Sequence, residues 1–181
     1  MITVGPAIGQ CNINNTQKEK IMGYYVNTAE VDFFIAKYNF EDAYKACVAL
    51  NDRDDLKSGG GGRFVLPNGE EMKWGDPRPE GMSYHPMKWF SWMDANYPET
   101  CKTLDEILTS LGFEISYDEI GNIDGLSYSS KIGAEEHFLE AISPFVRNTS
   151  YINWVGEDNA MWRHEFIEGK MIVKQPKIIW E

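Results

Sequence analysis

The chain has 181 residues, of which 43% are hydrophobic and 25% charged, and it carries a formal net charge of −11. This length suits one domain with a sizeable core, and the hydrophobic content excludes an intrinsically disordered protein. No apolar run approaches the roughly 20 residues that a membrane-spanning helix requires, and Met1–Cys11 lacks the Lys or Arg that begins a secretory signal. We therefore expect a cytoplasmic protein that does not engage a membrane.

The first 21 residues differ from the rest in composition. Cys11–Lys20 is rich in Asn, Gln and Lys and shows no hydrophobic periodicity, which predicts an unstructured leader. Lys18-Glu19-Lys20 lies just ahead of Met22 and is compatible with a purine-rich ribosome-binding site translated as protein. We therefore hypothesise that the natural start is Met22, and a genuine flexible arm is the alternative.

A strand and a helix are predicted next. Tyr24–Ile35 is rich in β-branched and aromatic residues, as strands are, and Asn39 is a favourable N-cap for the helix that follows. One face of this helix is apolar and comprises Phe40, Ala43, Tyr44, Cys47 and Leu50. Cys47 is therefore expected in the core, and its spacing from Cys11 and Cys101 matches neither a disulfide framework nor a zinc site.

Residues 52–100 are predicted to form an insertion. Gly59–Gly62 predicts a flexible connector, since no Lys-Ser or Lys-Thr follows it as in a phosphate-binding loop. Pro86 is a favourable first residue for a helix over 87–96. The large side chains on and beside this helix are Trp89, Phe90, Trp92, Met93 and Tyr97. They would give it two aromatic faces, which indicates burial in the core or, alternatively, an anchor for a partner.

The second half of the chain alternates short helices and strands. Thr103 and Glu106 form a capping-box pattern ahead of a helix over 104–111, and Gly112 suits its end. A second helix, 134–145, has an apolar face that includes Phe138 and Ile142. Strands are predicted over residues 113–117, 126–130, 150–155, 160–166 and 170–173.

Without the insertion, this order of elements reads βαββαβ followed by additional strands. It predicts an α+β fold with a ferredoxin-like antiparallel sheet and helices on one face. The insertion at 52–100 would contain helix, and the C-terminal strands would extend the sheet as a meander. We expect residues 22–181 to form a single domain.

Short segments at both ends of the chain carry a resemblance to a known family. The matching residues are Met22-Gly23-Tyr24-Tyr25, Trp162-Arg163, Gly169, and Pro176–Trp180 with Ile178 before Ile179. In these features the chain resembles a family of short uncharacterised bacterial and phage proteins, which start with Met-Gly-Tyr-Tyr and end in a Pro-x-Ile-x-Trp tail. The resemblance implies no activity, but it supports Met22 as the start.

Acidic residues are concentrated between Asp105 and Glu168. This segment holds thirteen Asp or Glu against three bases, so it accounts for −10 of the whole-chain charge of −11. Such a field repels nucleic acid and attracts basic surfaces, which predicts a protein partner with a basic groove and no direct nucleic-acid ligand. The residues expected to contact this partner are Glu114, Asp118, Glu119, Asp124, Glu157 and Asp158. The alternative is that the acidity only keeps the protein soluble.

Catalytic patterns are sparse, and we expect no metal and no cofactor. Asp118–Gly125 has some features of a calcium-binding loop, but Ile120 stands where an oxygen ligand is required, so a hairpin turn is the better interpretation. His164 and the neighbouring Arg163 and Glu165 are candidates for general acid–base chemistry on a phosphodiester, with His137 as a further candidate. Adjacent residues of a strand face opposite sides, so His164 should share its face with Trp162 and Phe166 rather than with Arg163 and Glu165.

These observations favour a small acidic inhibitor of phage or mobile-element type. It would occupy the basic groove of a nucleic-acid-handling host defence complex by imitating nucleic acid, as an anti-CRISPR protein does. Two alternatives remain: a metal-free ribonuclease or nucleotide-acting enzyme, and an immunity protein that neutralises a toxin. The sequence indicates no oligomeric state.

Overall fold

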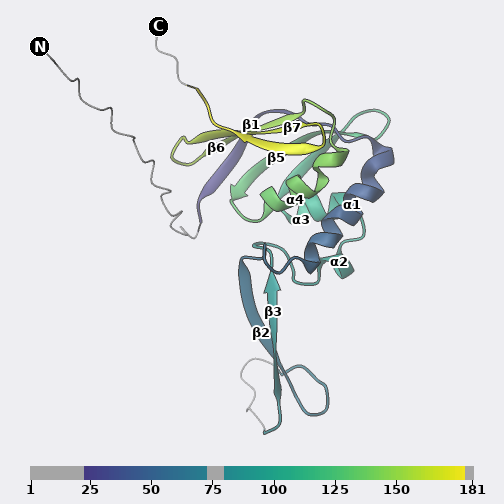
Figure 1. Ribbon diagram of the computed structural model, residues 1–181, viewed down its shortest axis with the longest axis vertical. Coiled ribbons are helices and arrows are strands. Elements are labelled where there is room, and N and C mark those ends of the chain that lie inside the picture. The colour runs from purple at the N-terminus through teal and green to yellow at the C-terminus, as the bar shows by residue number, and fades with distance from the viewer. Residues whose placement is uncertain (1–22, 73–79, 178–181) are drawn as a thin grey trace, which may run out of the picture.

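The computed structural model describes residues 23–72 and 80–177. These residues form a mixed α+β fold, in which helices cover one face of a six-stranded sheet and a two-stranded ribbon projects from the body (Figure 1). The predicted leader, residues 1–21, and the end of the tail, residues 178–181, lie outside the described residues. Among the described residues, no helix is long and apolar enough to cross a membrane.

The bounds of the elements follow the chain. The sheet consists of β1 (Tyr25–Asp32), β4 (Phe113–Tyr117), β5 (Ile123–Lys131), β6 (Tyr151–Gly156), β7 (Met161–Ile167) and β8 (Lys170–Lys174). The helices are α1 (Phe40–Ala49), α2 (Tyr97–Thr100), α3 (Leu104–Ser110) and α4 (Glu135–Ile142). The ribbon consists of β2 (Gly59–Val65) and β3 (Ser83–Trp89). Short 3-10 turns cover Lys37–Asn39, Leu50–Asp52 and Ser143–Phe145.

The sheet is antiparallel throughout, with the strand order β4-β5-β1-β6-β7-β8. β1 lies inside it and pairs with β5 on one side and with β6 on the other, so that Val26 faces Ser130 and Gly156. The crossovers α1 and α4 pack against each other, and α1 also packs against α3. The C-terminal strands predicted as a meander are β6, β7 and β8, and that prediction is confirmed.

The core lies between the inner face of the sheet and the helices. Trp154 on β6 is 1% exposed and stacks on Trp162 with ring centroids 6.1 Å apart. Phe113 and Tyr128 approach Trp154 edge-on from the other side. Alternation along β6 and β7 places Trp154 and Trp162 on this face, so the period-two pattern in the sequence located this part of the core correctly, and β4 and β5 supply Phe113 and Tyr128.

Two residues were predicted to cap the starts of helices, and only one of them does so in the structure. The Thr103 hydroxyl accepts a hydrogen bond from the Glu106 N–H at 3.2 Å, and Gly112 has a φ of +104°, as a C-terminal glycine often does. Asn39 precedes α1 as predicted, but its side chain does not cap the helix, because its Nδ2 donates to the Phe145 carbonyl at 3.2 Å. Asn39 therefore ties the start of α1 to the end of the α4 segment.

The insertion differs from its sequence-based prediction. Gly59–Gly62 is not a flexible connector but the first part of β2, paired in register with Pro86–Trp89 of β3. The helix expected over 87–96 is absent from the structure, since β3 continues to Trp89 and irregular turns follow up to α2. Pro86 is tolerated there because a two-stranded ribbon leaves one side of each strand without a ladder.

Aromatic rings explain why four consecutive glycines form a strand. A Cβ atom on Gly59 would lie 2.2 Å from Nε1 of Trp89, and one on Gly61 would lie 3.0 Å from its Cη2. A Cβ atom on Gly62 would lie 2.3 Å from the ring of Tyr84. The two rings thus lie flat on β2 where side chains would otherwise stand, and they stabilise a strand that glycine alone disfavours.

The aromatic residues after β3 are mainly part of the core. Phe90, Met93 and Tyr97 are buried, and the Tyr97 hydroxyl donates to the Cys47 carbonyl at 2.6 Å. Trp92 is 60% exposed with a φ of +68°, and its Nε1 donates to the Ile132 carbonyl at 3.0 Å. The core interpretation of this cluster therefore holds for three of its members, although Phe90 and Met93 do not lie on a helix and Tyr97 is the first residue of α2.

Replacing Gly59 by Ala should loosen the ribbon, because the new methyl group displaces the Trp89 indole. Gly60→Ala is the matched control, since its Cβ would meet nothing closer than the Met87 carbonyl at 4.0 Å. Hydrogen exchange of peptides from β2 and β3 measures the effect. Equal protection in the two variants would show that the ring does not lie on Gly59.

Replacing Trp154 by Ala should reduce the free energy of unfolding by about 3–5 kcal/mol, because a large cavity remains in the core. Trp92→Ala should cost about 1 kcal/mol, the usual contribution of the one hydrogen bond that its exposed side chain makes. Urea unfolding followed by far-ultraviolet circular dichroism measures both. Similar costs for the two variants would contradict this assignment of the core.

Candidate functional site

The turn between β4 and β5 is held together by Asp118. Its Oδ1 accepts hydrogen bonds from the backbone N–H groups of Ile120 and Asn122 at 3.0 and 2.9 Å. Its Oδ2 accepts one from the Asn122 side chain at 2.7 Å, and this bond is the main cause that lowers the pKa of Asp118. The hairpin-turn interpretation of this segment is confirmed, and Asp118 has a structural role in it.

The acidic residues predicted to bind a partner lie in two groups. Four of them are on the β4–β5 hairpin, namely Glu114, Asp118, Glu119 and Asp124. The turn of that hairpin lies beside the end of β1, where Ile35 pairs with Ile123. Glu157 and Asp158 form the β6–β7 turn, which follows Gly156 beside the start of β1. Because the eight residues of β1 span about 26 Å, the two turns lie at opposite ends of the sheet, and Glu114, the register partner of Ser127, lies between them.

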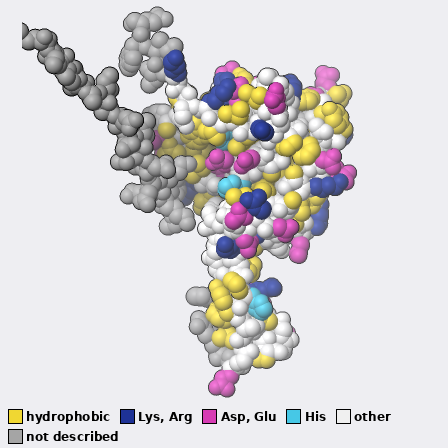
Figure 2. Space-filling view, viewed as in Figure 1, with side chains coloured by type: hydrophobic (Ala, Val, Ile, Leu, Met, Phe, Trp, Pro, Cys, Tyr) yellow, Lys and Arg dark blue, Asp and Glu magenta, His cyan; other side chains and the backbone are white. Residues whose placement is uncertain are grey.

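The acidic charge between Asp105 and Glu168 is largely uncompensated. Of the thirteen carboxylates in this segment, only Glu165 forms a salt bridge with a described residue, which is Lys174. The three bases of the segment are engaged elsewhere: Arg147 pairs with Asp32, Lys131 lies over the Tyr25 ring, and Arg163 bonds to Asn153. Figure 2 shows Asp and Glu side chains spread over the visible face of the body among Lys and Arg side chains.

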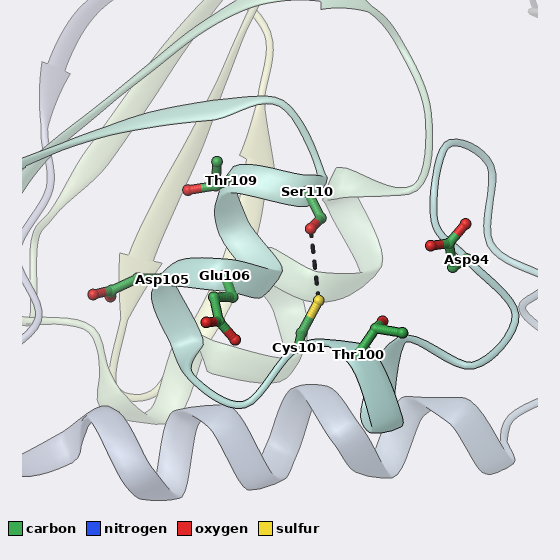
Figure 3. Close-up of a pocket in the computed structure, with 7 residues that line it drawn as sticks. All are labelled: Asp94, Thr100, Cys101, Asp105, Glu106, Thr109 and Ser110. Atoms are coloured by element: carbon green, nitrogen blue, oxygen red, sulfur yellow. Dashed lines mark hydrogen bonds between the residues drawn. The ribbon is translucent and has the colours of Figure 1, made fainter.

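A hollow of about 420 Å³ opens between α2 and α3 (Figure 3). It is lined by Asp94, Thr100, Cys101, Asp105, Glu106, Thr109 and Ser110. The Cys101 thiol faces the Ser110 hydroxyl at 3.6 Å, and only 7% of Cys101 is exposed. A smaller hollow of about 230 Å³ adjoins it and reaches Trp92, Met93 and Tyr97.

Contacts with α1 and β4 fix the walls of this hollow. The Tyr44 hydroxyl on α1 donates to the Cys101 carbonyl at 2.9 Å, which holds the chain between α2 and α3 in place. Burial, followed by a hydrogen bond with Asp105, raises the pKa of Tyr117 to about 12. Asp105 therefore links the start of α3 to the end of β4, next to the acidic turn at Asp118.

The three carboxylates that line the hollow are those of Asp94, Asp105 and Glu106. None of them forms a salt bridge with a residue in the described part of the chain. Hydroxyl groups from three Thr or Ser residues complete the lining. A pocket of this composition suits a cationic side chain better than an anion, because carboxylates repel an anion and accept hydrogen bonds from ammonium or guanidinium groups.

The candidate catalytic residues are not brought together. His164 is 4% exposed on the inner face of β7, with its ring 5.7 Å from that of Trp154. Arg163 and Glu165 lie on the opposite face of the sheet, as their alternation along β7 predicts. His137 lies on α4, and its ring packs against Phe90 at 5.9 Å.

The outer face of the sheet holds a connected polar network. The Tyr151 hydroxyl donates to Glu30 at 2.9 Å, and Nε of Arg163 donates to the Asn153 side chain at 2.7 Å. The Arg163 guanidinium lies over the Tyr151 ring, 4.1 Å from its centroid. These contacts account for Arg163 as a structural cation, and Glu165 is engaged by Lys174.

No metal centre is indicated by the geometry: residues 23–72 and 80–177 contain no group of three or more His, Cys, Asp or Glu side chains that could hold an ion. Comparison with known proteins finds no protein-family model, no curated protein and no solved structure that matches the chain.

The sequence interpretation missed the hollow. Thr103 and Glu106 were recognised only as a helix-capping pattern, and Cys101 only as one of three unpaired cysteines. A weak signal was present, since five of the seven lining residues fall within the ten positions from Cys101 to Ser110. Asp94 joins them only because the irregular segment after β3 folds back, and no local pattern encodes that path.

The stability of the protein should fall more steeply in mild acid when His164 is present. Burial lowers the pKa of His164 below its ordinary value of 6.5, and the charge of Glu136 on α4 acts in the opposite direction with a smaller effect. Below about pH 6.5, His164 is protonated more readily in the unfolded chain than in the folded protein. The stability that is present above that pH is therefore lost as the pH falls. Thermal midpoints of wild type and His164→Leu at pH 7.5 and 5.5 measure the difference, with exposed His85→Gln as the control. A pH dependence unchanged by His164→Leu would contradict this.

Proposed function

We propose that this protein binds a basic groove on a partner protein through its acidic surface and thereby blocks nucleic acid from that groove. The observation that carries the proposal is the uncompensated charge: among thirteen carboxylates between Asp105 and Glu168, Glu165 alone forms a salt bridge with a described residue. A basic groove that holds nucleic acid offers the counter-charges that these carboxylates lack. A small inhibitor of a host nucleic-acid-handling defence complex is the biological role that fits this activity.

The hollow between α2 and α3 gives the proposal a location. Asp105 in its lining forms a hydrogen bond with Tyr117, which is followed by Asp118 and Glu119 on the adjacent turn. A partner Lys or Arg that enters the hollow would meet Asp94 and Glu106 together. We assign Glu157 and Asp158, at the other end of the sheet, a secondary role, because one groove would have to follow the length of β1 to reach both groups.

The enzyme alternative has less support. A general acid or base must reach its substrate, and His164 is 4% exposed beneath the sheet, while Arg163 and Glu165 face the other side. An immunity protein against a toxin would use the same acidic surface as an inhibitor. The identity of the partner separates those two roles.

We also propose that β6-β1-β5-β4 forms a ferredoxin-like unit. The order of these four strands, their antiparallel pairing and the packing of the crossovers α1 and α4 on each other support it. In this description β7 and β8 extend one edge, and the ribbon is inserted between α1 and β4. The resemblance of both chain ends to short bacterial and phage proteins, and the cytoplasmic location, stay predictions.

Charge reversal at the hollow should abolish partner binding. Asp94→Lys combined with Glu119→Lys alters two exposed carboxylates for which the structure shows no hydrogen bond or salt bridge. Glu140→Lys combined with Glu168→Lys makes the same change in net charge at two exposed residues that neither line the hollow nor belong to the predicted partner-binding set, so it is the matched control. Wild type should capture a nucleic-acid-binding protein from the native host and displace a single-stranded oligonucleotide from it, and only the first variant should lose both abilities.

Salt provides the second readout of this experiment. The affinity of wild type for the captured protein should fall on the order of tenfold between low and moderate ionic strength, since exposed charges are screened within about 10 Å at 0.1 M salt. Binding that is insensitive to salt and survives reversal at the hollow would refute the proposal. Equal losses in both variants would place the contact outside the hollow.

A further inference from the structure

Trp92 differs from the other aromatic residues of the segment after β3, because its indole is exposed and yet fixed in position. It is 60% exposed and lines the smaller of the two hollows. Its Nε1 donates to the Ile132 carbonyl at 3.0 Å, and a Cβ atom on Gly133 would lie 2.1 Å from its Cδ1. One side of the ring therefore lies on the backbone at Gly133, and the exposed area belongs to the remainder of the indole.

The backbone beneath the indole is fixed as well. The Ile132 N–H donates to the Tyr24 carbonyl at 2.8 Å, and the Gly133 N–H donates to the carboxylate of Glu135 at 2.7 Å. Glu135 is itself buried at the start of α4. A ring that is held in this way loses little conformational entropy when a ligand stacks on it, so Trp92 is preorganised for binding.

Backbone strain accompanies this exposed position. Trp92 has a φ of +68°, in the left-handed region that a bulky side chain rarely adopts. Its neighbours Phe90 and Met93 are buried, so the turn directs one large aromatic side chain outward while the residues around it enter the core. Strained residues of this kind concentrate at binding sites, where the surrounding structure imposes the conformation.

The smaller hollow beside the indole combines apolar walls with one carboxylate. Its lining includes the buried side chains of Met93 and Tyr97. Asp94 is exposed and lines both hollows, and its carboxylate forms no hydrogen bond or salt bridge with any residue of 23–72 or 80–177. A side chain that complements these walls has an apolar stem and a positive charge at its end.

We propose that the indole of Trp92 and the carboxylate of Asp94 together bind the guanidinium group of an arginine on the partner protein. The inference rests on the proposed function, because it specifies which basic side chain of the partner the smaller hollow receives. A guanidinium stacks flat on an indole and donates two parallel hydrogen bonds to a carboxylate in its own plane. The apolar stem of the arginine packs against Met93.

Arginine suits this pair of groups better than lysine does. The ammonium group of lysine is compact and strongly hydrated, and it has no plane with which to stack on a ring or to match a carboxylate. In the larger hollow, Asp105 and Glu106 offer carboxylates to a second base, and its described lining includes no aromatic residue. Selection of arginine over lysine is therefore assigned to Trp92 alone.

Hexaarginine and hexalysine peptides, which carry equal charge, test the proposal by titration calorimetry of the full chain at low and moderate salt. Wild type should bind hexaarginine about fivefold more tightly than hexalysine, as expected for a cation–π contact at an exposed site. Trp92→Leu should bind the two peptides with equal affinity. Tyr38→Leu removes an aromatic side chain that is 84% exposed and lines neither hollow, so it should retain the preference.

Gly133→Ala tests the placement of the indole without deleting it. The new methyl group displaces the ring, so this variant should also lose the preference, whereas Gly60→Ala, whose Cβ atom meets no close neighbour, should keep it. Circular dichroism checks that each variant is folded. In nuclear magnetic resonance spectra, the indole N–H signal that is missing from Trp92→Leu should be the one that hexaarginine shifts most in wild type.

The outcomes separate this inference from the function on which it rests. Salt-dependent binding of both peptides with equal affinity would overturn the assignment of arginine and leave the proposed function standing. A preference for hexaarginine that survives in both Trp92→Leu and Gly133→Ala would also overturn it. Binding of neither peptide to wild type would refute the proposed function, and the inference with it.

Discussion

The pairing of β1 with both β5 and β6 is the constraint on which the rest of the structure depends. The β4–β5 hairpin attaches to one side of β1, and the three C-terminal strands attach through β6 to the other. Both pairings of β1 join residues far apart in the chain, and they satisfy backbone N–H and C=O groups that would otherwise be buried without partners. Because β1 sets the direction of the β4–β5 hairpin and of the C-terminal strands, it also places one acidic turn at each end of the sheet.

Charge is distributed unequally with respect to this framework. Ion pairs occur on α1, at the base of the ribbon and on the outer face of the sheet, whereas the carboxylates around α3 and the β4–β5 turn have hydrogen bonds or no partner. A local excess of one charge destabilises a folded protein slightly and raises its attraction for a partner of opposite charge. The hollow beside Cys101 concentrates that excess in a concave surface.

The inserted ribbon shows how one sequence pattern permits two structures. Four glycines in a row suit a flexible linker when no side chain covers them, and here Trp89 and Tyr84 cover them from the opposite strand. The covering residues lie more than twenty positions away, beyond the reach of any local rule. The same long-range pairing draws Pro86 into a strand, although its sequence context resembles the start of a helix.

Elements with local sequence signals could be predicted before the fold was known. Alternation located β6 and β7, and the Thr103 and Glu106 pattern located α3, because side-chain direction and helix capping depend on neighbouring residues. The acidic excess was likewise visible in the composition. Long-range packing, in contrast, separates the excess into two groups, brings Asp94 and Glu106 to the lining of one hollow, and buries His164 away from Arg163. Each of these depends on which distant strands and loops pack together, and that is decided by the burial of the whole core rather than by any single segment.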